Sequence, residues 1–309
     1  MGSTRRAALA ALLGVALVAA GCSPTPAGTA APPTETVPPT ETTSVALVAD
    51  PAPLRDVEKQ YGIRLGVYAV NVHTGQTLSY REDEPFAMMS TFKTYAAAAL
   101  LRRHQLASGF FATVVTYTED DLVANSPVTS EHVATGMTVA ELCEAAITRS
   151  DNTAGNLLLR LLGGPAAITA FARDIKDTRT RLDRWETELN TAIPGDDRDT
   201  TTPAAIGEGY RSLVLGDVLG EPEREQLKTW LLANTTGGER IRAGLPKDWK
   251  TADKTGSGDY GSANDVAITW TPDGTPIVLA ILTTKGVEGA EYDNAALAAV
   301  AKVAAETLG

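Results

Sequence analysis

The sequence predicts an α+β fold: an antiparallel sheet flanked by terminal helices, with an all-helical domain inserted between its strands. Alternating apolar residues that are typical of strands occur at residues 65–80 and again at residues 265–284. Between them, from Met89 to Leu232, the apolar spacing is almost wholly helical. Because strands so far apart have to meet in one sheet, the helical middle should form a separate body, with a cleft where the two halves meet.

The first predicted elements of the folded region are a helix and a β-hairpin. Arg55 to Tyr61 has helical character and ends at Gly62, a residue type that suits a helix C-terminus. The alternating strand Leu65 to Val72 is followed by a turn at His73 to Gln76 and by the return strand Thr77 to Tyr80.

The rest of the folded region is predicted as a series of helices, a second pair of strands and a last helix. The middle helices share apolar residues three to four positions apart and are Thr94–Arg103, Thr138–Arg149, Ala154–Leu162, Pro165–Arg173, Pro203–Val214 and Glu221–Ala233. The strands Asp265–Thr271 and Pro276–Thr284 flank a turn at Pro272–Thr275. An Ala-rich helix, Asn294–Leu308, closes the chain.

Residues 1–21 have the pattern of a signal peptide for export. Two Arg precede the apolar stretch Ala7 to Ala20, which is too short and too rich in Ala for a spanning helix. The run Ala19 to Cys22 resembles a bacterial lipobox, in which the Cys becomes the lipidated first residue of the mature protein. Residues 22–45, rich in Pro and Thr, would then be a disordered tether. We expect membrane attachment only through Cys22; cleavage and release as a secreted or periplasmic protein is the alternative.

The charge balance argues against nucleic acid as a partner. The chain has 38 Asp and Glu against 27 Lys and Arg, a formal net charge of −11, and no long basic run. Its three His are scattered without ligand spacing, so we expect no metal and no cofactor. Cys143 has apolar neighbours at helical spacing and is predicted to be a buried, inert thiol.

The segment from Ser90 to Lys93 contains the one Ser-x-x-Lys motif of the sequence. At the start of a helix this spacing places the hydroxyl and the ammonium on one face, with the Cβ atoms about 5 to 6 Å apart. The Lys can then act as a base or an electrostatic activator for a Ser whose own pKa is too high for unaided attack. Ser90 is therefore the candidate nucleophile and Lys93 its activator.

Two further motifs are weak when each is taken alone. Ser150-Asp151-Asn152 lies between two helical patterns, and an ordinary helix N-cap is the alternative interpretation. Lys254-Thr255-Gly256 by itself is typical of a strand end followed by a turn. The Gly-rich run from Gly256 to Gly261 also matches GxGxxG, but a strand follows it instead of a helix, which argues against a dinucleotide site.

The three motifs, in this order, resemble those of class A serine β-lactamases, relatives of the penicillin-binding proteins. The resemblance covers residues 46–309 and implies a two-domain β-lactamase-like fold. Its α/β domain would comprise residues 46–87 and 237–309, and its all-α domain residues 88–236, with an Ω-loop at about 181–200. It implies hydrolysis of β-lactam antibiotics through a serine acyl-enzyme, and antibiotic resistance.

The segment from Arg184 to Asn190 resembles the Ω-loop pattern that separates the hydrolases from their penicillin-binding relatives. The resemblance makes Glu186 the base that activates the deacylating water, with Asn190 holding the same water. Glu188 is the competing carboxylate, to which the Glu-x-x-Leu-Asn spacing gives a structural or exposed role. A salt bridge between Arg184 and Asp199 would close the neck of the loop; two separate surface charges are the alternative.

The same resemblance assigns the remaining roles. Ser150 would relay a proton to the β-lactam nitrogen, with electrostatic support from Lys254, and Asn152 would hold the amide of the substrate side chain. The backbone N–H groups of Ser90 and Ser257 would form the oxyanion hole. The substrate-binding residues implied are Asn152, Asn190, Thr255, Gly256, Ser257, Arg240 and Asn125.

Some positions depart from the best-known members. Ala263 stands where many carry an Arg on the strand after the Lys-Thr-Gly motif. Arg240 would supply the guanidinium that binds the substrate carboxylate instead; Arg242 is the less favoured alternative, and an ordinary surface Arg is the other interpretation. Asn125 stands where an aromatic residue often lines the entrance.

Two rival functions remain open on the sequence. A penicillin-binding D,D-peptidase would share the acylation machinery, and Glu186 with Asn190 argues against it. A tethered β-lactam sensor would need a spanning helix or a cytoplasmic domain to receive its signal, and the sequence predicts neither. We expect a monomer that acts on small-molecule β-lactams.

Overall fold

The computed structural model describes Gly21 and residues 48–309. The predicted signal peptide, the lipidation site Cys22 and the tether lie outside the described residues, Gly21 excepted.

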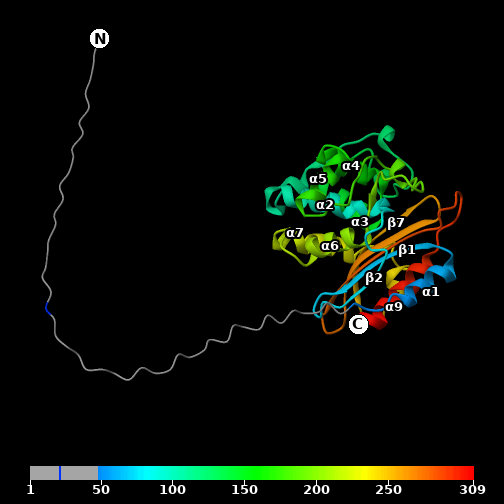
Figure 1. Cartoon of the computed structure of the whole chain (residues 1–309). Helices are drawn as coiled ribbons and strands as arrows, with labels where there is room; N and C mark the ends of the chain where they lie inside the picture. The colour runs from blue at the N-terminus through cyan, green and yellow to red at the C-terminus, as the bar shows by residue number, and fades with distance from the viewer. Residues whose placement is uncertain (1–20, 22–47) are drawn as a thin grey trace, which may run out of the picture. The chain divides into compact units, whose positions relative to one another are not determined.

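One antiparallel sheet joins the two ends of the described region (Figure 1). Its strands are β1 (Arg64–Asn71), β2 (Thr77–Tyr80), β7 (Lys250–Gly258), β8 (Ser262–Trp270) and β9 (Pro276–Thr284). Their order is β2-β1-β9-β8-β7, so β1 pairs with β9 in a register that begins with Arg64 opposite Thr284. The sheet that the sequence predicts from distant segments is thus present.

Side chains of the sheet alternate between two apolar layers. On β9, Leu279 belongs to the cluster that packs with α1 (Ala52–Tyr61), α8 (Ile241–Gly244) and α9 (Asn294–Leu308). The next residue, Ala280, belongs to the cluster that continues into the helical body on the other face. The alternation follows from the two-residue period of a strand, and it lets one sheet support two layers.

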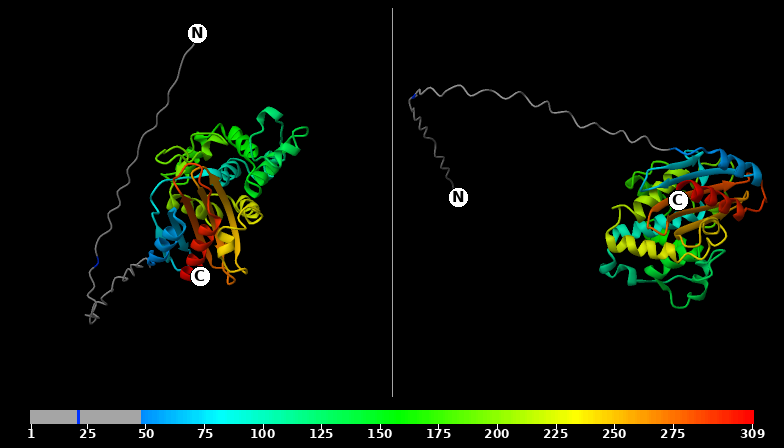
Figure 2. Two further views of the ribbon diagram at one scale, coloured as in Figure 1. Left: turned by 90° about the vertical axis from the view of Figure 1, so that its right-hand side faces the viewer. Right: turned by 90° about the horizontal axis from the view of Figure 1, so that it is seen from below.

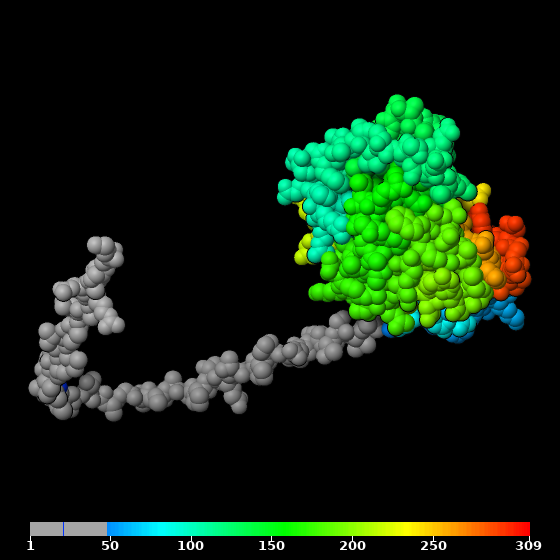
Figure 3. Space-filling model, turned by 90° about the horizontal axis from the view of Figure 1, so that it is seen from above, coloured from blue at the N-terminus to red at the C-terminus, as the bar shows by residue number. Residues whose placement is uncertain are grey.

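The helical body packs on the second face of the sheet and surrounds α2. Its helices are α2 (Phe92–Arg103), α3 (Val139–Thr148), α4 (Asn152–Leu162), α5 (Ala166–Asp174), α6 (Pro203–Val214) and α7 (Glu221–Leu232). Figures 1 and 2 show them on one side of the sheet, with α1 and α9 on the other. Every residue of α2 from Phe92 to Leu101 is buried, which makes it the central helix. In the view of Figure 3 the helical body covers most of the visible face.

Short elements connect these layers. They are the strand pairs β3 (Phe86–Ala87) with β6 (Thr200–Thr201) and β4 (Val114–Val115) with β5 (Met137–Thr138), and the 3-10 turns Met89–Thr91, Leu106–Ser108, Phe110–Ala112, Glu119–Asp121, Thr129–Glu131 and Glu188–Asn190. Within residues 48–309 no single helix is long and apolar enough to cross a membrane; α4 and α5 reach that length only as a sharply bent pair. The predicted domain boundaries at residues 88 and 237 stay a prediction.

The predicted helices and strands are confirmed to within a few residues, and the one substantial error concerns β7. The sequence suggested that Lys254-Thr255-Gly256 ends a strand and enters a turn. Instead β7 runs on to Gly258, because Ser257 and Gly258 still pair with the start of β8. The turn comes later, at Tyr260 and Gly261, whose φ angles are positive. The motif therefore lies on a rigid strand and not at a loop.

The close packing of α8 on α9 gives a test of the fold. A Cβ on Gly244 would overlap the carbonyl oxygen of Ala298, a backbone atom that cannot rotate away. We expect Gly244→Ala to lower the free energy of unfolding by about 1 to 3 kcal/mol, the usual cost of overpacking. In a domain of this size that corresponds to a loss of about 2 to 4 °C in Tm for each kcal/mol, measured by calorimetry.

Gly238→Ala is the matched control, since a Cβ at Gly238 meets nothing within 4 Å. Equal melting temperatures for the two variants would contradict the packing described here.

Candidate active site

Ser90 and Lys93 lie side by side at the buried start of α2. The chain enters the helix through the 3-10 turn Met89–Thr91, so Ser90 is held one turn before Lys93. Lys93 Nζ is 3.0 Å from Ser90 Oγ and also donates to the carbonyl of Ser150 and to Asn152 Oδ1. Burial lowers the pKa of Lys93, and the nearby carboxylate of Glu186 opposes this. A lysine with a lowered pKa can accept a proton from the hydroxyl beside it.

Glu186 reaches the same point from the Ω-loop. Its Oε1 lies 2.9 Å from Lys93 Nζ and 3.3 Å from Ser90 Oγ, and its side chain is fully buried. Asn190 Nδ2 donates to Glu186 Oε2, whereas Asn190 Oδ1 is buried and has no hydrogen-bond partner in the described chain. Glu188, the competing carboxylate, is exposed. Only Glu186 of the two therefore faces the serine.

Asn156, which no sequence motif indicated, holds the backbone of Glu186. Asn156 Oδ1 accepts from the Glu186 N–H and Asn156 Nδ2 donates to the Glu186 carbonyl, each at 2.9 Å. Asn156 lies four residues after Asn152 on α4, so both amides occupy one helix face. The four-residue spacing between the two Asn was the one sequence feature that could have pointed to Asn156.

The neck of the Ω-loop is closed by one buried carboxylate. Asp199 Oδ2 accepts from Arg184 Nε at 2.6 Å, and Asp199 Oδ1 accepts from the backbone N–H groups of Asp183 and Arg184. The Asp199 side chain is fully buried. Two separate surface charges, the other interpretation of this pair, do not describe this geometry.

Ser150 and Lys254 are in direct contact. Lys254 Nζ donates to Ser150 Oγ at 2.9 Å and to the carbonyl of Thr255 at 2.8 Å. Burial holds the pKa of Lys254 well below its usual range, and the charge of Lys93 acts in the same direction. In the Ser-Asp-Asn motif the N-cap is Asp151, which accepts from the N–H of Ala154. Capping thus explains Asp151 and leaves the hydroxyl of Ser150 free to contact the lysine.

Strand β7 lies directly against the start of α2. A Cβ on Gly256 would be 3.3 Å from the Ser90 nitrogen, so the strand backbone approaches the serine closely where the Gly occurs. On the outer side, Thr255 Oγ1 lies 2.6 Å from Thr236 Oγ1, and Ser257 Oγ accepts from Arg240 Nη2 at 2.6 Å. These hydroxyls and the guanidinium form a polar strip along the edge of the sheet.

The two candidate arginines have different surroundings. Arg240 reaches the Ser257 hydroxyl, and Ala263 lies opposite Ser257 in the register. Arg242 donates to Asp253 Oδ1 at 2.6 Å and to the carbonyl of Thr251, so it is bound to residues of β7 that precede Lys254. Arg240 is thus the guanidinium beside the site.

Asn125 and Cys143 are placed as follows. Asn125 is exposed with a positive φ of 59°, and its carbonyl accepts from the N–H of Asn152 at 3.0 Å. It therefore supports Asn152 through its backbone.

Cys143 is fully buried and unpaired, and burial raises the pKa of its thiol. The prediction of a buried thiol is confirmed.

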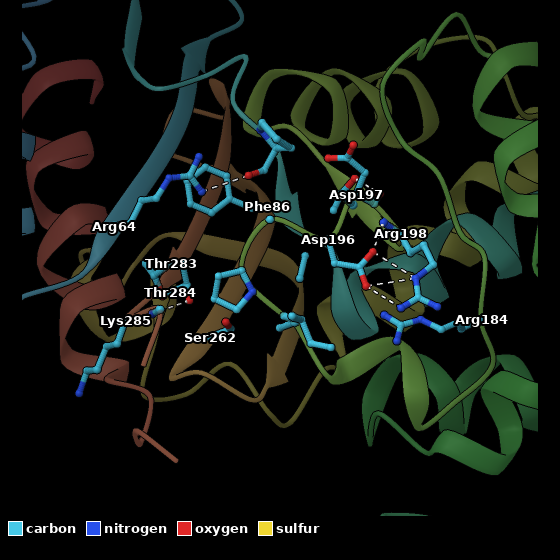
Figure 4. A pocket seen from close by; sticks show the side chains of 18 residues that line it. Arg64, Phe86, Arg184, Asp196, Asp197, Arg198, Ser262, Thr283, Thr284 and Lys285 are labelled. Carbon is cyan, nitrogen blue, oxygen red and sulfur yellow. Dashed lines mark hydrogen bonds and ion pairs between the residues drawn. The ribbon is translucent and has the colours of Figure 1, made fainter. Parts of the chain in front are cut away.

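A cavity of about 430 Å³ lies behind the second half of the Ω-loop and is separate from the serine (Figure 4). Its lining includes Phe86, Ser262 and three arginines but none of Ser90, Lys93 or Glu186. The arginines are each paired with a carboxylate: Arg64 with Glu84, Arg184 with Asp199 and Arg198 with Asp196. Figure 4 shows Arg184 and Arg198 near Asp196, at one end of the cavity. The cavity is therefore a separate feature from the Ser90 cluster.

The fold and the site are those of a serine hydrolase, with a buried serine just before a central helix and two buried lysines beside it. Residues 52–308 match the sequence model of the Beta-lactamase enzyme family. The Nocardia asteroides protein "Beta-lactamase AST-1" is 56% identical over 305 residues, which cover 99% of this chain and 97% of the relative. The Nocardia farcinica protein "Beta-lactamase FAR-1" is 59% identical over 242 residues, which cover 78% of this chain and 77% of the relative.

Solved structures agree with these relatives. The β-lactamase from Streptomyces albus G has a TM-score of 0.82 and 52% identity, and the match covers 83% of this chain and 98% of that one. The β-lactamase from Desulfarculus baarsii has a TM-score of 0.82 and 50% identity, with 84% and 99% covered. The chain belongs to the β-lactamase enzyme family and is a class A serine β-lactamase.

The neck of the Ω-loop can be tested by stability. Asp199→Ala would leave the Arg184 guanidinium and two backbone N–H groups without their acceptor in a buried place. We expect a loss of about 3 kcal/mol in the free energy of unfolding, measured with urea.

Asp196→Ala is the control, because Asp196 pairs with Arg198 at the surface and its loss should leave the urea midpoint nearly unchanged. An Asp199→Ala midpoint as high as that of Asp196→Ala would show that the neck contributes little.

Proposed function

We propose that this β-lactamase opens the β-lactam ring by attack of Ser90 and that a water activated by Glu186 hydrolyses the resulting acyl-enzyme. The observation that carries the proposal is the position of Glu186 Oε1, 2.9 Å from Lys93 Nζ and 3.3 Å from Ser90 Oγ. One carboxylate thereby contacts both the nucleophile and the buried lysine. The hydrolysis of β-lactams itself follows from the family.

Acylation requires a base for the Ser90 proton and a donor for the leaving nitrogen. Lys93 and Glu186 are both in reach of Ser90 Oγ, and either can take the proton. Ser150, whose hydroxyl accepts from Lys254, is the group proposed to pass a proton to the β-lactam nitrogen. The cationic lysine favours release of that proton, because it stabilises the oxygen left behind.

The oxyanion of the tetrahedral intermediate is assigned to two backbone N–H groups, those of Ser90 and Ser257. Support comes from the close approach of β7 to the Ser90 nitrogen at Gly256. Donors of this kind are fixed before the reaction and are typically worth about 2.7 to 4 kcal/mol each in the transition state.

Deacylation needs a water that is positioned and deprotonated on the far side of the ester. Asn190 binds Glu186 through Nδ2, and its Oδ1 has no partner within the described chain, so that oxygen can accept a hydrogen bond from the attacking water. Glu186 then takes the water proton as general base. A penicillin-binding peptidase lacking such a carboxylate would remain acylated.

Substrate binding is assigned to the edge of β7 and to α4. Thr255, Ser257 and Arg240 would bind the substrate carboxylate, and the short bond between Arg240 and Ser257 supports this grouping. Asn152, which already accepts from Lys93, would donate to the carbonyl of the substrate side chain. Asn125 lies exposed beside it and would form the rim.

Glu186→Ala is the test of this mechanism. The variant keeps Ser90, Lys93 and Ser150, so it should still be acylated while deacylation falls by about 10² to 10⁴, the usual contribution of general-base catalysis. A stopped-flow experiment with a chromogenic cephalosporin should then give a burst of one equivalent and a slow steady phase, with the adduct visible by mass spectrometry.

Glu188→Ala is the control and should turn over like the wild type, and Ser90→Ala should form no adduct. Stalling of Glu188→Ala in place of Glu186→Ala would mean that the wrong carboxylate was chosen. If neither stalls, the deacylation mechanism fails.

We further propose that the enzyme is exported and attached to the membrane through a lipid on Cys22. Support comes from the apolar segment that ends at Gly21-Cys22 and from the Pro and Thr-rich stretch after it. A diacylglyceryl group together with an N-acyl chain would anchor the protein firmly, whereas one acyl chain binds only marginally. An anchored enzyme outside the cytoplasm would destroy β-lactams before they reach their targets, which is how it would confer resistance.

Fractionation of bacteria that express the full-length chain tests the anchor. Wild type should sediment with the membranes, and Cys22→Ala should appear in the soluble or unprocessed fraction. Thr25→Ala, a change in the neighbouring stretch, should behave like the wild type. The anchor is excluded if Cys22→Ala partitions as the wild type does.

A further inference from the structure

Arg240 is a buried cation without a carboxylate in contact. The residue is only 5% exposed, and its guanidinium donates to the carbonyls of Gly256 and Asn264, each at 2.7 Å. It also donates to Ser257 Oγ and to Asn294 Oδ1. All four acceptors are neutral. Within residues 48–309 no Asp or Glu oxygen lies within ion-pair distance of this guanidinium, in contrast to Arg242, which is paired with Asp253.

The carboxyl group that could have compensated Arg240 is Asp265, the residue after Asn264 on β8. Asp265 is fully buried. Its Oδ2 accepts from the N–H of Ile241 at 3.1 Å, and its Oδ1 has no hydrogen-bond partner in the described chain. Ile241 follows Arg240 directly and begins α8. Asp265 therefore fixes the backbone from which the Arg240 side chain extends.

The titratable and charged groups around Asp265 come from three elements. From α6 there is the buried Tyr210, whose hydroxyl donates to the Thr91 carbonyl. From β7 there are Asp253 and Lys254, and from the start of α8 there are Arg240 and, through its pair with Asp253, Arg242. Asp253 is held by Arg242 Nε and Asn234 Nδ2, each at 2.6 Å, so it keeps the negative charge of the two carboxyls. Burial and the charge of Asp253 hold the pKa of Asp265 well above its usual range. Two close buried carboxyls rarely ionise together, so the proton resides on Asp265.

A buried guanidinium surrounded only by neutral acceptors gains most from an incoming anion. Had Asp265 been ionised, it would have balanced the charge of Arg240 and weakened the attraction for a substrate carboxylate. As a neutral group that still accepts from the Ile241 N–H, it holds the backbone without supplying a counter-ion.

We propose that Asp265 is a positioning residue for recognition of the substrate carboxylate: it fixes the backbone beside Arg240 and leaves that guanidinium without a counter-ion until substrate binds. The inference rests on the proposed role of Arg240. It assigns Asp265 an effect on KM and little effect on kcat, because a carboxylate contact made in the ground state is mainly uniform binding.

Steady-state kinetics with benzylpenicillin on the full chain test this, using Asp265→Asn, Asp265→Ala and Arg240→Ala. The Asn amide oxygen can still accept from Ile241 and is always neutral, so KM should stay within about twofold of wild type. Asp265→Ala removes the acceptor and should raise KM about fivefold to tenfold with kcat nearly unchanged, the range expected for one lost hydrogen bond. Arg240→Ala should raise KM at least as much.

The pH profile of wild type against Asp265→Asn is the second measurement and remains informative if Asp265→Ala fails to fold. As pH rises through the raised pKa of Asp265, the wild-type side chain loses its proton and begins to balance Arg240, so KM should climb. In Asp265→Asn this component should be absent, while Asp253, Lys254 and Tyr210 are present in both proteins. The difference between the two profiles isolates Asp265.

The role of Arg240 and the role of Asp265 can fail independently. An unchanged KM in Arg240→Ala overturns the role of Arg240 in the proposed function. A raised KM in Arg240→Ala with equal KM profiles for wild type and Asp265→Asn overturns the inference about Asp265. A KM in Asp265→Asn as high as in Asp265→Ala also overturns it, since the conservative variant should rescue binding.

Discussion

The buried ion pair between Lys93 and Glu186 is the interaction on which the site depends. Both side chains are fully withdrawn from water, and a single charge left there without its partner would be strongly destabilising. The pair joins the central helix α2 to the Ω-loop, two segments that are far apart in the sequence. Asp199 closes the neck of the loop and the amide of Asn156 holds the backbone of Glu186, so that Glu186 is kept against the helix.

Positive charge gathers locally in a protein that is acidic overall. Lys93, Lys254 and Arg240 are all buried around the site, although the whole chain has a formal net charge of −11. Attraction of an anionic substrate therefore depends on short-range charges in a water-poor place, where they act more strongly than surface charges do. Burial also lowers the pKa of both lysines, so each releases a proton more readily than an exposed lysine does.

Much of the fold and of the site was predictable because it depends on local patterns. Helical and strand periodicity marked the long helices and four of the five strands of the main sheet, and the spacing of Ser90 and Lys93 marked the candidate nucleophile. The continuation of β7 was missed because the pairing of Ser257 and Gly258 with β8 overrides the turn tendency of Gly and Ser. The partners of Asn156 and Asp265, which are Glu186 and Ile241, are distant in the sequence, so neither contact could be predicted; for Asn156 the four-residue spacing from Asn152 gave the helix face but not the partner.

The order of the strands also governs when the protein can fold. β1 lies between β2 and β9, so the middle of the sheet is incomplete until residues 276–284 exist. Closing that long loop is entropically costly, and folds with such distant pairings form slowly. Until β8 and β9 are present, the helical body has no complete sheet to pack against. A chain that lacks its C-terminal strands also leaves one edge of β1 unpaired. The sheet that carries the site is thus completed only after residues 276–284 have been made.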